Sequence, residues 1–326
     1  MKTHRLGRSG LQVSELCLGC MSFGDPLRGG HPWTLPKDES RDLIRQAIEA
    51  GINFLDTANV YSDGSSEEII GEVLWHIARR DEVVLATKVQ GVMLNEPQMA
   101  GLSRRSILHN IDASLKRLRT DHVDLYQIHR WDNDTPIEET MEALHDVVKA
   151  GKARYLGAST MWAWQFAKAQ EAARAHGWTP FVAMQNQINL LYREEEHEMI
   201  PLCRDQGVGL IPWSPIGRGK LARPAASVTE RSAKDGYMKF LFAKTAEADA
   251  RVIAAVQSLA VELGRPMAQI AMAWVRQKPG VTAPIVGVTK PDQLAEAIAG
   301  LDLVLTPGQM AELEAPYIPR QPLGQM

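Results

Sequence analysis

The chain has 326 residues, 45% of them hydrophobic, and its 36 Lys and Arg residues nearly balance 39 Asp and Glu residues. That length allows one large α/β barrel or two smaller domains, and the net charge of −3 excludes the basic excess of nucleic-acid or anionic-membrane binding proteins. No apolar run approaches the roughly 18 residues of a membrane span, and residues 1–15 lack the apolar centre of a secretory signal. With only three cysteines a disulfide framework is not expected, which favours the cytoplasm.

Short apolar runs alternate with helical patterns along the chain, and each run predicts a buried strand. The clearest helical patterns cover 39–51, 103–118 and 137–151. Strand–helix alternation indicates parallel strands joined by crossovers, and an unbroken series of eight favours a closed (β/α)8 barrel. We therefore expect a single domain over residues 1–326. The eight runs are 15–19, 52–56, 83–88, 123–129, 153–159, 181–185, 208–214 and 283–289.

Local patterns add detail to this barrel. Residues 4–14 predict a hairpin around Ser9 and Gly10 that plugs its bottom. Ser65 and Glu68 predict a capping box at a helix start. Residues 217–245 form the longest irregular stretch, which is typical of a functional lid. No GxGxxG pattern follows an early run, so the fingerprint of a Rossmann domain is missing.

Titratable side chains follow three consecutive apolar runs. Asp56 ends the second run and Tyr61 lies in the loop after it, Lys88 ends the third, and His129 ends the fourth. Barrel enzymes hold their active sites at the C-terminal ends of the strands, so these four side chains are expected to meet. Asp56 and Lys88 alone fit a structural salt bridge, because buried charges need partners. The four together favour acid–base catalysis.

The later runs end on a different kind of residue. Ser159 and Gln185 are suited to binding an amide, and the flat indole of Trp213 is suited to stacking on a ring, although a core aromatic is the simpler interpretation. The backbone and cations of 217–220, with Lys290 before a helix N-terminus, are suited to phosphates. These features indicate a large planar cofactor that carries phosphates.

Cys17 and Cys20 form an isolated C-x-x-C pattern. A zinc site needs a second pair of ligands at a suitable spacing, and the sequence offers none, so no metal is expected. The remaining interpretations are a redox pair or two small apolar residues at a strand end.

Several stretches together resemble the aldo/keto reductase family over essentially the whole chain. The stretches 17–24, 34–41 and 128–144 are most similar to the bacterial YajO-type branch of that family. The motifs that carry the family resemblance are INFLDTANVYSDGSSEEIIGE, LYQIHRWD, YLGAST, MQNQINLLYREEE, IPWSPIGRG and PIVGVTKPDQLAEA.

The resemblance implies a catalytic tetrad of Asp56, Tyr61, Lys88 and His129. It also implies NADPH extended across the barrel mouth under a long covering loop, and reversible reduction of an aldehyde or ketone. Three positions depart from common family residues, namely Cys20, Thr160 and Ala297. The cofactor-binding residues that the resemblance implies are Gly19, Cys20, Met21, Asp56, Ser159, Gln185, Trp213, Ser214, Pro215, Ile216, Gly217, Arg218, Lys220, Gly287, Thr289, Lys290, Gln293 and Glu296.

The expected chemistry centres on a phenol as the proton donor. Free tyrosine has a pKa near ~10, and an ammonium about 4 Å away stabilises the phenolate by on the order of 4 kcal/mol, so Lys88 is expected to lower the pKa of Tyr61. Asp56 keeps Lys88 charged, and His129 orients the substrate oxygen. Two alternatives remain: a Schiff-base lyase acting through Lys88, and a non-catalytic nucleotide-sensing subunit.

Overall fold

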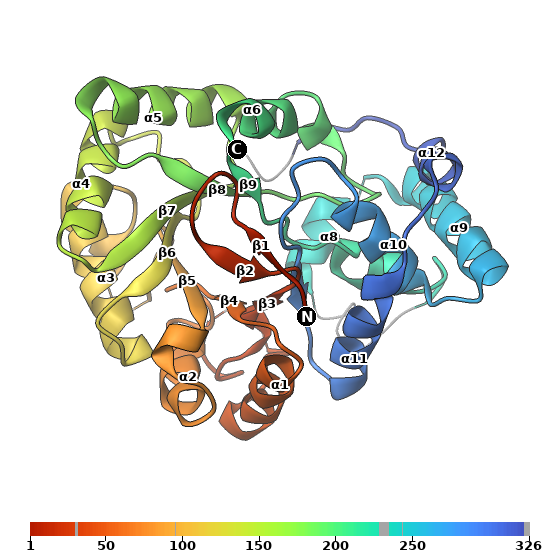
Figure 1. The fold of residues 1–326 in the computed structure, drawn as a ribbon, viewed down its shortest axis with the longest axis horizontal. Coiled ribbons are helices and arrows are strands. Elements are labelled where there is room, and N and C mark those ends of the chain that lie inside the picture. The colour runs from red at the N-terminus through yellow and green to blue at the C-terminus, as the bar shows by residue number, and fades with distance from the viewer. Residues whose placement is uncertain (30–31, 95, 228–234, 243, 323–326) are drawn as a thin grey trace.

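The computed structural model describes residues 1–326 apart from 30–31, 95, 228–234, 243 and 323–326. Its centre is an eight-stranded parallel sheet in the order β10-β3-β4-β5-β6-β7-β8-β9 (Figure 1). The strands are β3 Cys17–Gly19, β4 Phe54–Asp56, β5 Val84–Val89, β6 Val123–Ile128, β7 Ala153–Ser159, β8 Phe181–Gln185, β9 Gly209–Leu210 and β10 Ile285–Gly287.

Backbone hydrogen bonds join the two ends of this sheet. The Leu210 amide donates to the Gly280 carbonyl at 3.1 Å, and the Ile285 amide donates to the Pro212 carbonyl at 2.8 Å. The sheet therefore curls into the predicted (β/α)8 barrel, and each of the eight apolar runs contributes one strand. Several of the runs yield strands of only two or three residues, and in the runs 208–214 and 283–289 a proline, which cannot donate to the sheet, lies beside the strand.

Helices surround the barrel, with α1 to α6 on one side and α9 to α12 grouped on the other (Figure 1). The amphipathic patterns 39–51, 103–118 and 137–151 correspond to the first, third and fourth of these helices. The helices are α1 Lys37–Glu49, α2 Ser65–Val73, α3 Arg104–Leu118, α4 Ile137–Lys149, α5 Ala163–His176, α6 Met199–Gln206, α8 Gly236–Phe242, α9 Ala246–Leu263, α10 Met267–Arg276, α11 Pro291–Ala299 and α12 Pro307–Glu314.

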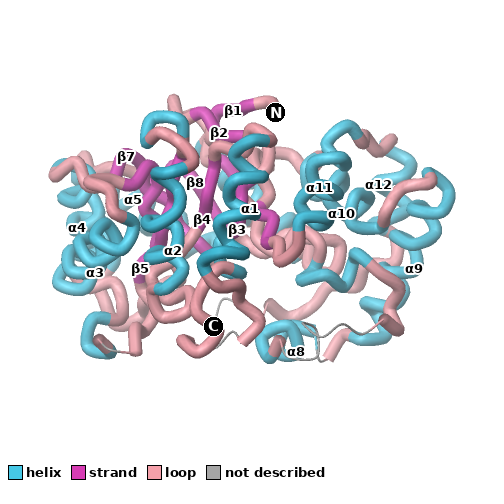
Figure 2. The backbone as a smooth tube through the Cα atoms, turned by 90° about the horizontal axis from the view of Figure 1, so that it is seen from below, coloured by secondary structure: helices cyan, strands magenta, loops and turns pink. Residues whose placement is uncertain are grey.

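The predicted hairpin closes one end of the barrel. Its strands β1 Thr3–Arg5 and β2 Gln12–Ser14 pair antiparallel. Leu6 and Val13 are fully buried and pack inside the barrel against Phe54 and Val84, which begin their strands. The hairpin and α8 lie at opposite ends of the barrel (Figure 2). The mouth at the C-terminal ends of the strands is therefore the end left for a functional site.

The two-residue alternation of each strand decides which side chains point into the barrel. In β5, Val84 and Ala86 pack in the inner cluster, so Lys88 points inward too, whereas Leu85 and Val89 pack outward against the helices. Inward side chains near the strand ends come from four further strands. They are Asp56, Gln127, His129, Ser159 and Gln185.

The capping box expected at the start of α2 is wrong. Gly64, with φ of 86°, is the residue before the helix, and Ser65 is already helical. The Ser65 hydroxyl donates to the Ser62 carbonyl at 2.9 Å and accepts from the Asp25 amide at 2.8 Å, so it is occupied by loop contacts. Glu68 pairs with Arg28 at 2.7 Å instead of reaching back to the backbone.

The segment 217–245 is less irregular than its sequence suggests. It contains a 3-10 helix at Gly217–Ala222 and the helix α8, while 228–234 and 243 lie outside the described residues. Its described parts, including Arg223 and Tyr237, line a cleft at the barrel mouth. The segment therefore borders the cleft and is partly helical, and its function as a lid stays a prediction.

Candidate active site

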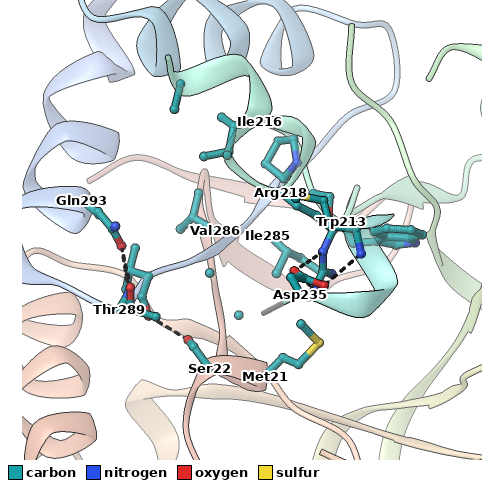
Figure 3. Close-up of a pocket in the computed structure, with 18 of the residues that line it drawn as sticks. Met21, Ser22, Trp213, Ile216, Arg218, Asp235, Ile285, Val286, Thr289 and Gln293 are labelled. Carbon is teal, nitrogen blue, oxygen red and sulfur yellow. Dashed lines mark hydrogen bonds and ion pairs between the residues drawn. The ribbon is translucent and has the colours of Figure 1, made fainter. Parts of the chain in front are cut away.

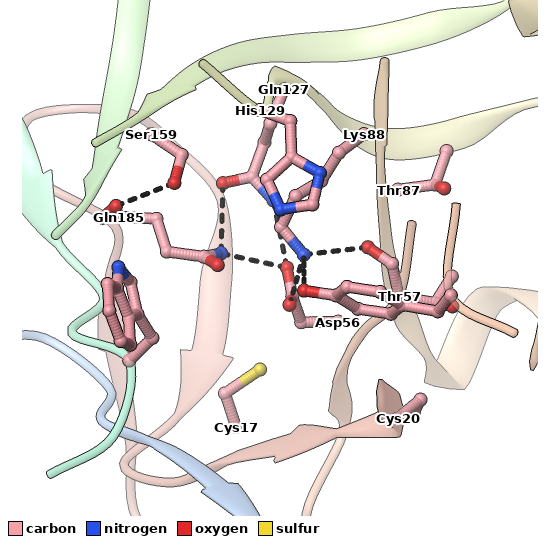
Figure 4. A network of polar contacts seen from close by, with 12 residues as sticks. Cys17, Cys20, Asp56, Thr57, Thr87, Lys88, Gln127, His129, Ser159 and Gln185 are labelled. Atoms are coloured by element: carbon pink, nitrogen blue, oxygen red, sulfur yellow. Dashed lines mark hydrogen bonds and ion pairs between the residues drawn. The ribbon is translucent and has the colours of Figure 1, made fainter. Parts of the chain in front are cut away.

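The side chains at the ends of β4 and β5 form a compact polar cluster with the loop that follows β4 (Figure 4). The Lys88 ammonium donates to a carboxylate oxygen of Asp56 at 2.6 Å and to the Thr57 carbonyl at 2.8 Å. Its third contact is the Tyr61 hydroxyl at 3.1 Å. These contacts use all three donors of the ammonium, and they fix its position beside the phenol.

Two amides hold the other oxygen of Asp56. Gln127 and Gln185 each donate to Oδ1 at 2.9 Å, and Gln185 also donates to the Gln127 side-chain oxygen at 3.3 Å. Gln127 is fully buried on β6, two residues before His129. Gln127 was not among the predicted site residues, although counting back two positions from His129 along the strand places it on the same inward face.

We expect Gln127→Leu to lower the free energy of unfolding by about 1–3 kcal/mol, because it removes a buried hydrogen bond to an ionised carboxylate. Urea unfolding measures this change. Gln170→Leu is the matched control, since Gln170 is also buried, but within the described part of the chain its side chain bonds the backbone of Phe181 alone, at 2.8 and 3.1 Å. Turnover should fall only in the Gln127 variant; an equal fall in both would remove Gln127 from the active-site network.

The electrostatics favour a charged lysine beside a neutral phenol. Burial lowers the pKa of Lys88, but the negative charge of Asp56 and the contact with Tyr61 outweigh it, so that pKa is raised above its usual value. Burial also raises the pKa of Tyr61, and the nearby Lys88 cation offsets this only in part. The expected net lowering of the tyrosine pKa is therefore not met, because the loss of hydration exceeds the attraction to Lys88.

His129 lies beside the phenol of Tyr61. Its ring meets the Tyr61 ring edge to face, with the centroids 5.7 Å apart. Burial and the cations Lys88 and Arg130 hold the pKa of His129 well below its usual value. A neutral imidazole at pH 7 can donate one hydrogen bond and accept another, which suits a group that orients a carbonyl oxygen.

A cleft of about 1400 Å³ runs across the barrel mouth, with Thr289 and Gln293 on one side and Trp213 on the other (Figure 3). Asp56, Tyr61 and His129 reach it, whereas Lys88 lies fully buried beneath them. The other expected residues that line the cleft are Gly19, Met21, Ser159, Gln185, Trp213, Ser214, Pro215, Ile216, Arg218, Lys220, Gly287, Thr289, Lys290, Gln293 and Glu296.

Two expected cofactor contacts do not line this cleft, namely Cys20 and Gly217. Cys20 is fully buried in the core between the barrel and its helices, and its thiol contacts the Leu18 carbonyl at 3.5 Å. Gly217 is buried, and its amide donates to the Ser214 carbonyl at 2.9 Å. Both residues instead support the backbone of their loops.

Trp213 is fixed at the edge of the cleft. Its indole N–H donates to the Thr160 hydroxyl at 3.0 Å, so the residue that departs from the family pattern orients the ring. Tyr237 of α8 lies 6.4 Å from the indole, measured between ring centroids. Ser159 donates to the backbone carbonyl of Gln185 at 2.8 Å, which ties two neighbouring strand ends together. Trp213 lines the cleft, and the stacking of its indole on a cofactor ring stays a prediction.

The cations expected to hold phosphates differ in their pairing. Arg218 forms an ion pair with the buried Asp235 at 2.6 Å, and Lys220 contacts the buried Asp249 at 3.2 Å. Lys290 is exposed and pairs with no carboxylate among the residues that the structure describes. Asp235 and Asp249 were not among the predicted site residues, because no local pattern connects them to cations 17 and 29 positions earlier.

Cys17, Cys20 and Cys203 are free and buried. Burial is the main reason why the pKa of the Cys17 thiol is raised well above its usual value, and the pKa of Cys20 is raised for the same reason. Such thiols are poor nucleophiles, which favours the apolar interpretation of the C-x-x-C pattern. The described residues contain no group of His, Cys, Asp or Glu arranged to bind a metal, and their helices include none suited to crossing a bilayer.

A parallel barrel with Asp56, Tyr61, Lys88 and His129 clustered at its C-terminal mouth, beside a cleft of about 1400 Å³, has the arrangement of the barrel enzymes. The chain belongs to the aldo/keto reductase family: the model of that family matches residues 15–318.

Relatives cover nearly the whole chain. Versiconal hemiacetal acetate reductase of Aspergillus parasiticus is 46% identical over 98% of both chains. An aldo-keto reductase of Alternaria alternata is 42% identical over 98% of this chain and 92% of its own. A putative aryl-alcohol dehydrogenase of Schizosaccharomyces pombe is 42% identical over 96% of this chain and 95% of its own. These relatives are fungal, so they do not support the expected bacterial YajO-type branch.

Proposed function

We propose that this protein reduces an aldehyde or ketone to an alcohol with NADPH, reversibly, and that Tyr61 supplies the proton. The observation that carries this proposal is the 3.1 Å contact between the Lys88 ammonium and the Tyr61 hydroxyl, with Asp56 bound to the same ammonium at 2.6 Å. Reduction of a carbonyl adds a hydride to carbon and a proton to oxygen. When bound, the nicotinamide supplies the hydride.

Each residue has a distinct part in this mechanism. Tyr61 is protonated at neutral pH, because the ordinary pKa of a phenol lies well above 7 and burial raises it further, so it can donate a proton to the substrate oxygen. Lys88 stabilises the phenolate that remains after this transfer. Asp56 keeps the ammonium charged and in place. His129 donates a hydrogen bond to the oxygen on which negative charge develops.

The cleft fits an extended dinucleotide. Its volume of about 1400 Å³ exceeds the roughly 300–1000 Å³ of an ordinary small-molecule pocket, which leaves space for a cofactor and a substrate together. Trp213 presents a flat ring near the Tyr61 end, and Ser159 and Gln185 supply polar groups beside it. Further along the cleft, Lys290 stands before the N-terminus of α11, where positive charge favours phosphate.

We expect tighter binding of NADPH than of NADH, by about tenfold or more, because the 2′-phosphate adds charge-assisted hydrogen bonds. Lys290 is the cation assigned to this phosphate, because Arg218 and Lys220 are already paired with carboxylates. Fluorescence titration of wild type and Lys290→Met measures both affinities. The variant should lose affinity for NADPH and keep its affinity for NADH; equal affinity of the wild type for both cofactors would contradict the assignment.

A Schiff-base lyase is the weaker candidate. A lysine that attacks a carbonyl must be uncharged and accessible, whereas Lys88 has a raised pKa, is fully buried and contacts Asp56 at 2.6 Å. Treatment with borohydride in the presence of a carbonyl substrate separates the two functions. A covalent adduct on Lys88 would favour the lyase over the reductase.

The decisive test of the proposed function is a screen of aldehydes, ketones, sugars and phosphorylated sugars. The oxidation of NADPH at fixed pH measures whether each compound is reduced. Reduction of any of these compounds supports the proposal. Binding of NADPH without reduction across the panel would favour a nucleotide sensor.

We also propose that residues 1–326 form one domain and act in the cytoplasm, where the three free cysteines would remain reduced.

A further inference from the structure

Arg130 places a second cation beside the candidate active site. It directly follows His129, lines the same cleft and is partly buried. Its guanidinium donates to the His129 carbonyl at 2.7 Å and to the Tyr237 hydroxyl at 3.5 Å. Both acceptors are neutral, and they use only two of the five N–H donors of an arginine.

The charge of Arg130 is not balanced by a neighbour. The Lys88 and Asp56 charges cancel within their pair, and so do those of Arg218 and Asp235. No carboxylate in the described part of the chain lies within ion-pair distance of Arg130. Its field nevertheless reaches the reacting groups: it opposes part of the rise in the pKa of Tyr61, and it adds to the lowering of the pKa of His129.

An unpaired, partly buried cation is costly to hold in a folded protein, and it attracts an anion into the cleft that it lines. A guanidinium also matches the two oxygens of a carboxylate, or those of a phosphate, in geometry. Tyr237 supports this role, because its hydroxyl contacts Arg130 while its ring lies 5.4 Å below the Arg218 guanidinium. The side chain is thereby held at the substrate end of the cleft.

We propose that Arg130 binds an anionic group of the substrate, so that the preferred substrates are carbonyl compounds that carry a carboxylate or a phosphate. This inference rests on the proposed reductase function, and it adds the class of substrate. The carbonyl oxygen lies between Tyr61 and His129, and the anionic group lies against the Arg130 guanidinium.

The test compares 3- and 4-formylbenzoate with their methyl esters, which have nearly the same shape and no charge. In the wild type, kcat/KM should be about 10- to 100-fold higher for one of the anions than for its ester, as expected for hydrogen bonds to a charged group. Arg130→Met should bring the ratio of kcat/KM for the anion to kcat/KM for its ester close to one. Arg130→Lys should keep part of the preference for the anion. Raising the ionic strength from about 0.05 M to about 0.5 M should bring this ratio of kcat/KM values closer to one in the wild type, because salt screens the attraction between Arg130 and the anion.

Arg154→Met is the matched control. It removes the same charge from the exposed second residue of strand β7, where Arg154, among the described residues, bonds the Gly151 carbonyl alone, and it should leave the ratio of kcat/KM values as in the wild type. Equal ratios of kcat/KM for anion and ester in the wild type and in Arg130→Met would overturn the inference about Arg130. Reduction of the esters in the same experiment would still support the proposed reductase function. Failure of both anions and both esters to oxidise NADPH or NADH, together with failure of the wider carbonyl panel, would overturn both.

Discussion

Tyr61→Phe is expected to lower kcat for carbonyl reduction by about 10²–10⁴-fold, the usual contribution of a positioned general acid. The substitution removes only the hydroxyl, so the ring keeps its edge-to-face contact with His129. Affinity for NADPH should change little, because the phenol acts on the substrate oxygen. Single-turnover kinetics measure the rate of reduction, and a fluorescence titration measures the affinity for NADPH. An equal loss of rate and affinity would contradict the assignment of Tyr61 as the proton donor.

The pH dependence follows from the same residue. A proton donor works only while it is protonated, and burial raises the pKa of Tyr61 above its usual value of about 10. The rate of reduction should therefore stay level through neutral and mildly alkaline pH, and decline only as the pH rises through that raised value. Loss of the rate already near neutral pH, with substrate and cofactor saturating, would indicate another proton donor.

Lys88→Met is expected to lower kcat by about 10³-fold, because an ammonium about 4 Å from a phenolate contributes on the order of 4 kcal/mol. The phenol remains in the variant, but the phenolate that forms during proton transfer loses its nearest cation, 3.1 Å away. Pre-steady-state measurement of NADPH oxidation tests this. Wild-type turnover in the variant would refute the electrostatic role of Lys88.

A folding control is needed for Lys88→Met, since it leaves the Asp56 carboxylate buried without its cation. Removal of one partner from a buried ion pair destabilises proteins by about 3–5 kcal/mol. The double variant Asp56→Asn/Lys88→Met removes both charges and should recover part of that stability without recovering turnover. Recovery of turnover together with stability would mean that Lys88 serves the fold alone.

The sequence was sufficient to predict the barrel and the meeting of Asp56, Tyr61, Lys88 and His129. Buried parallel strands are nearly continuous apolar runs, so the sequence predicts all eight of them. A polar residue at the end of such a run is easily identified as a candidate site residue. The contact of Lys88 with both Asp56 and Tyr61 follows from neighbouring strands whose inward residues end at one edge. These features depend on local pattern and on the geometry of parallel sheets.

Other features depend on contacts that no local pattern encodes. In the sequence, Gln127 is only a polar residue within a predicted strand. Its role depends on its contacts with Asp56 and Gln185, which are distant in the sequence. The partners Asp235 and Asp249 belong to a region whose helices were not foreseen. The net pKa of Tyr61 depends on how much water burial removes, and this opposes the effect of Lys88, which the sequence alone suggested.

The central claim is that the Lys88 cation stabilises the Tyr61 phenolate. Titration of ¹³C-labelled tyrosine by NMR measures this directly, with the Tyr61 signal assigned from Tyr61→Phe. Comparing Asp56→Asn with Asp56→Asn/Lys88→Met isolates the cation, because Asp56 otherwise raises the same pKa. We predict that Tyr61 titrates at a distinctly higher pH in the double variant. Titration of Tyr61 at the same pH in both proteins would contradict the account.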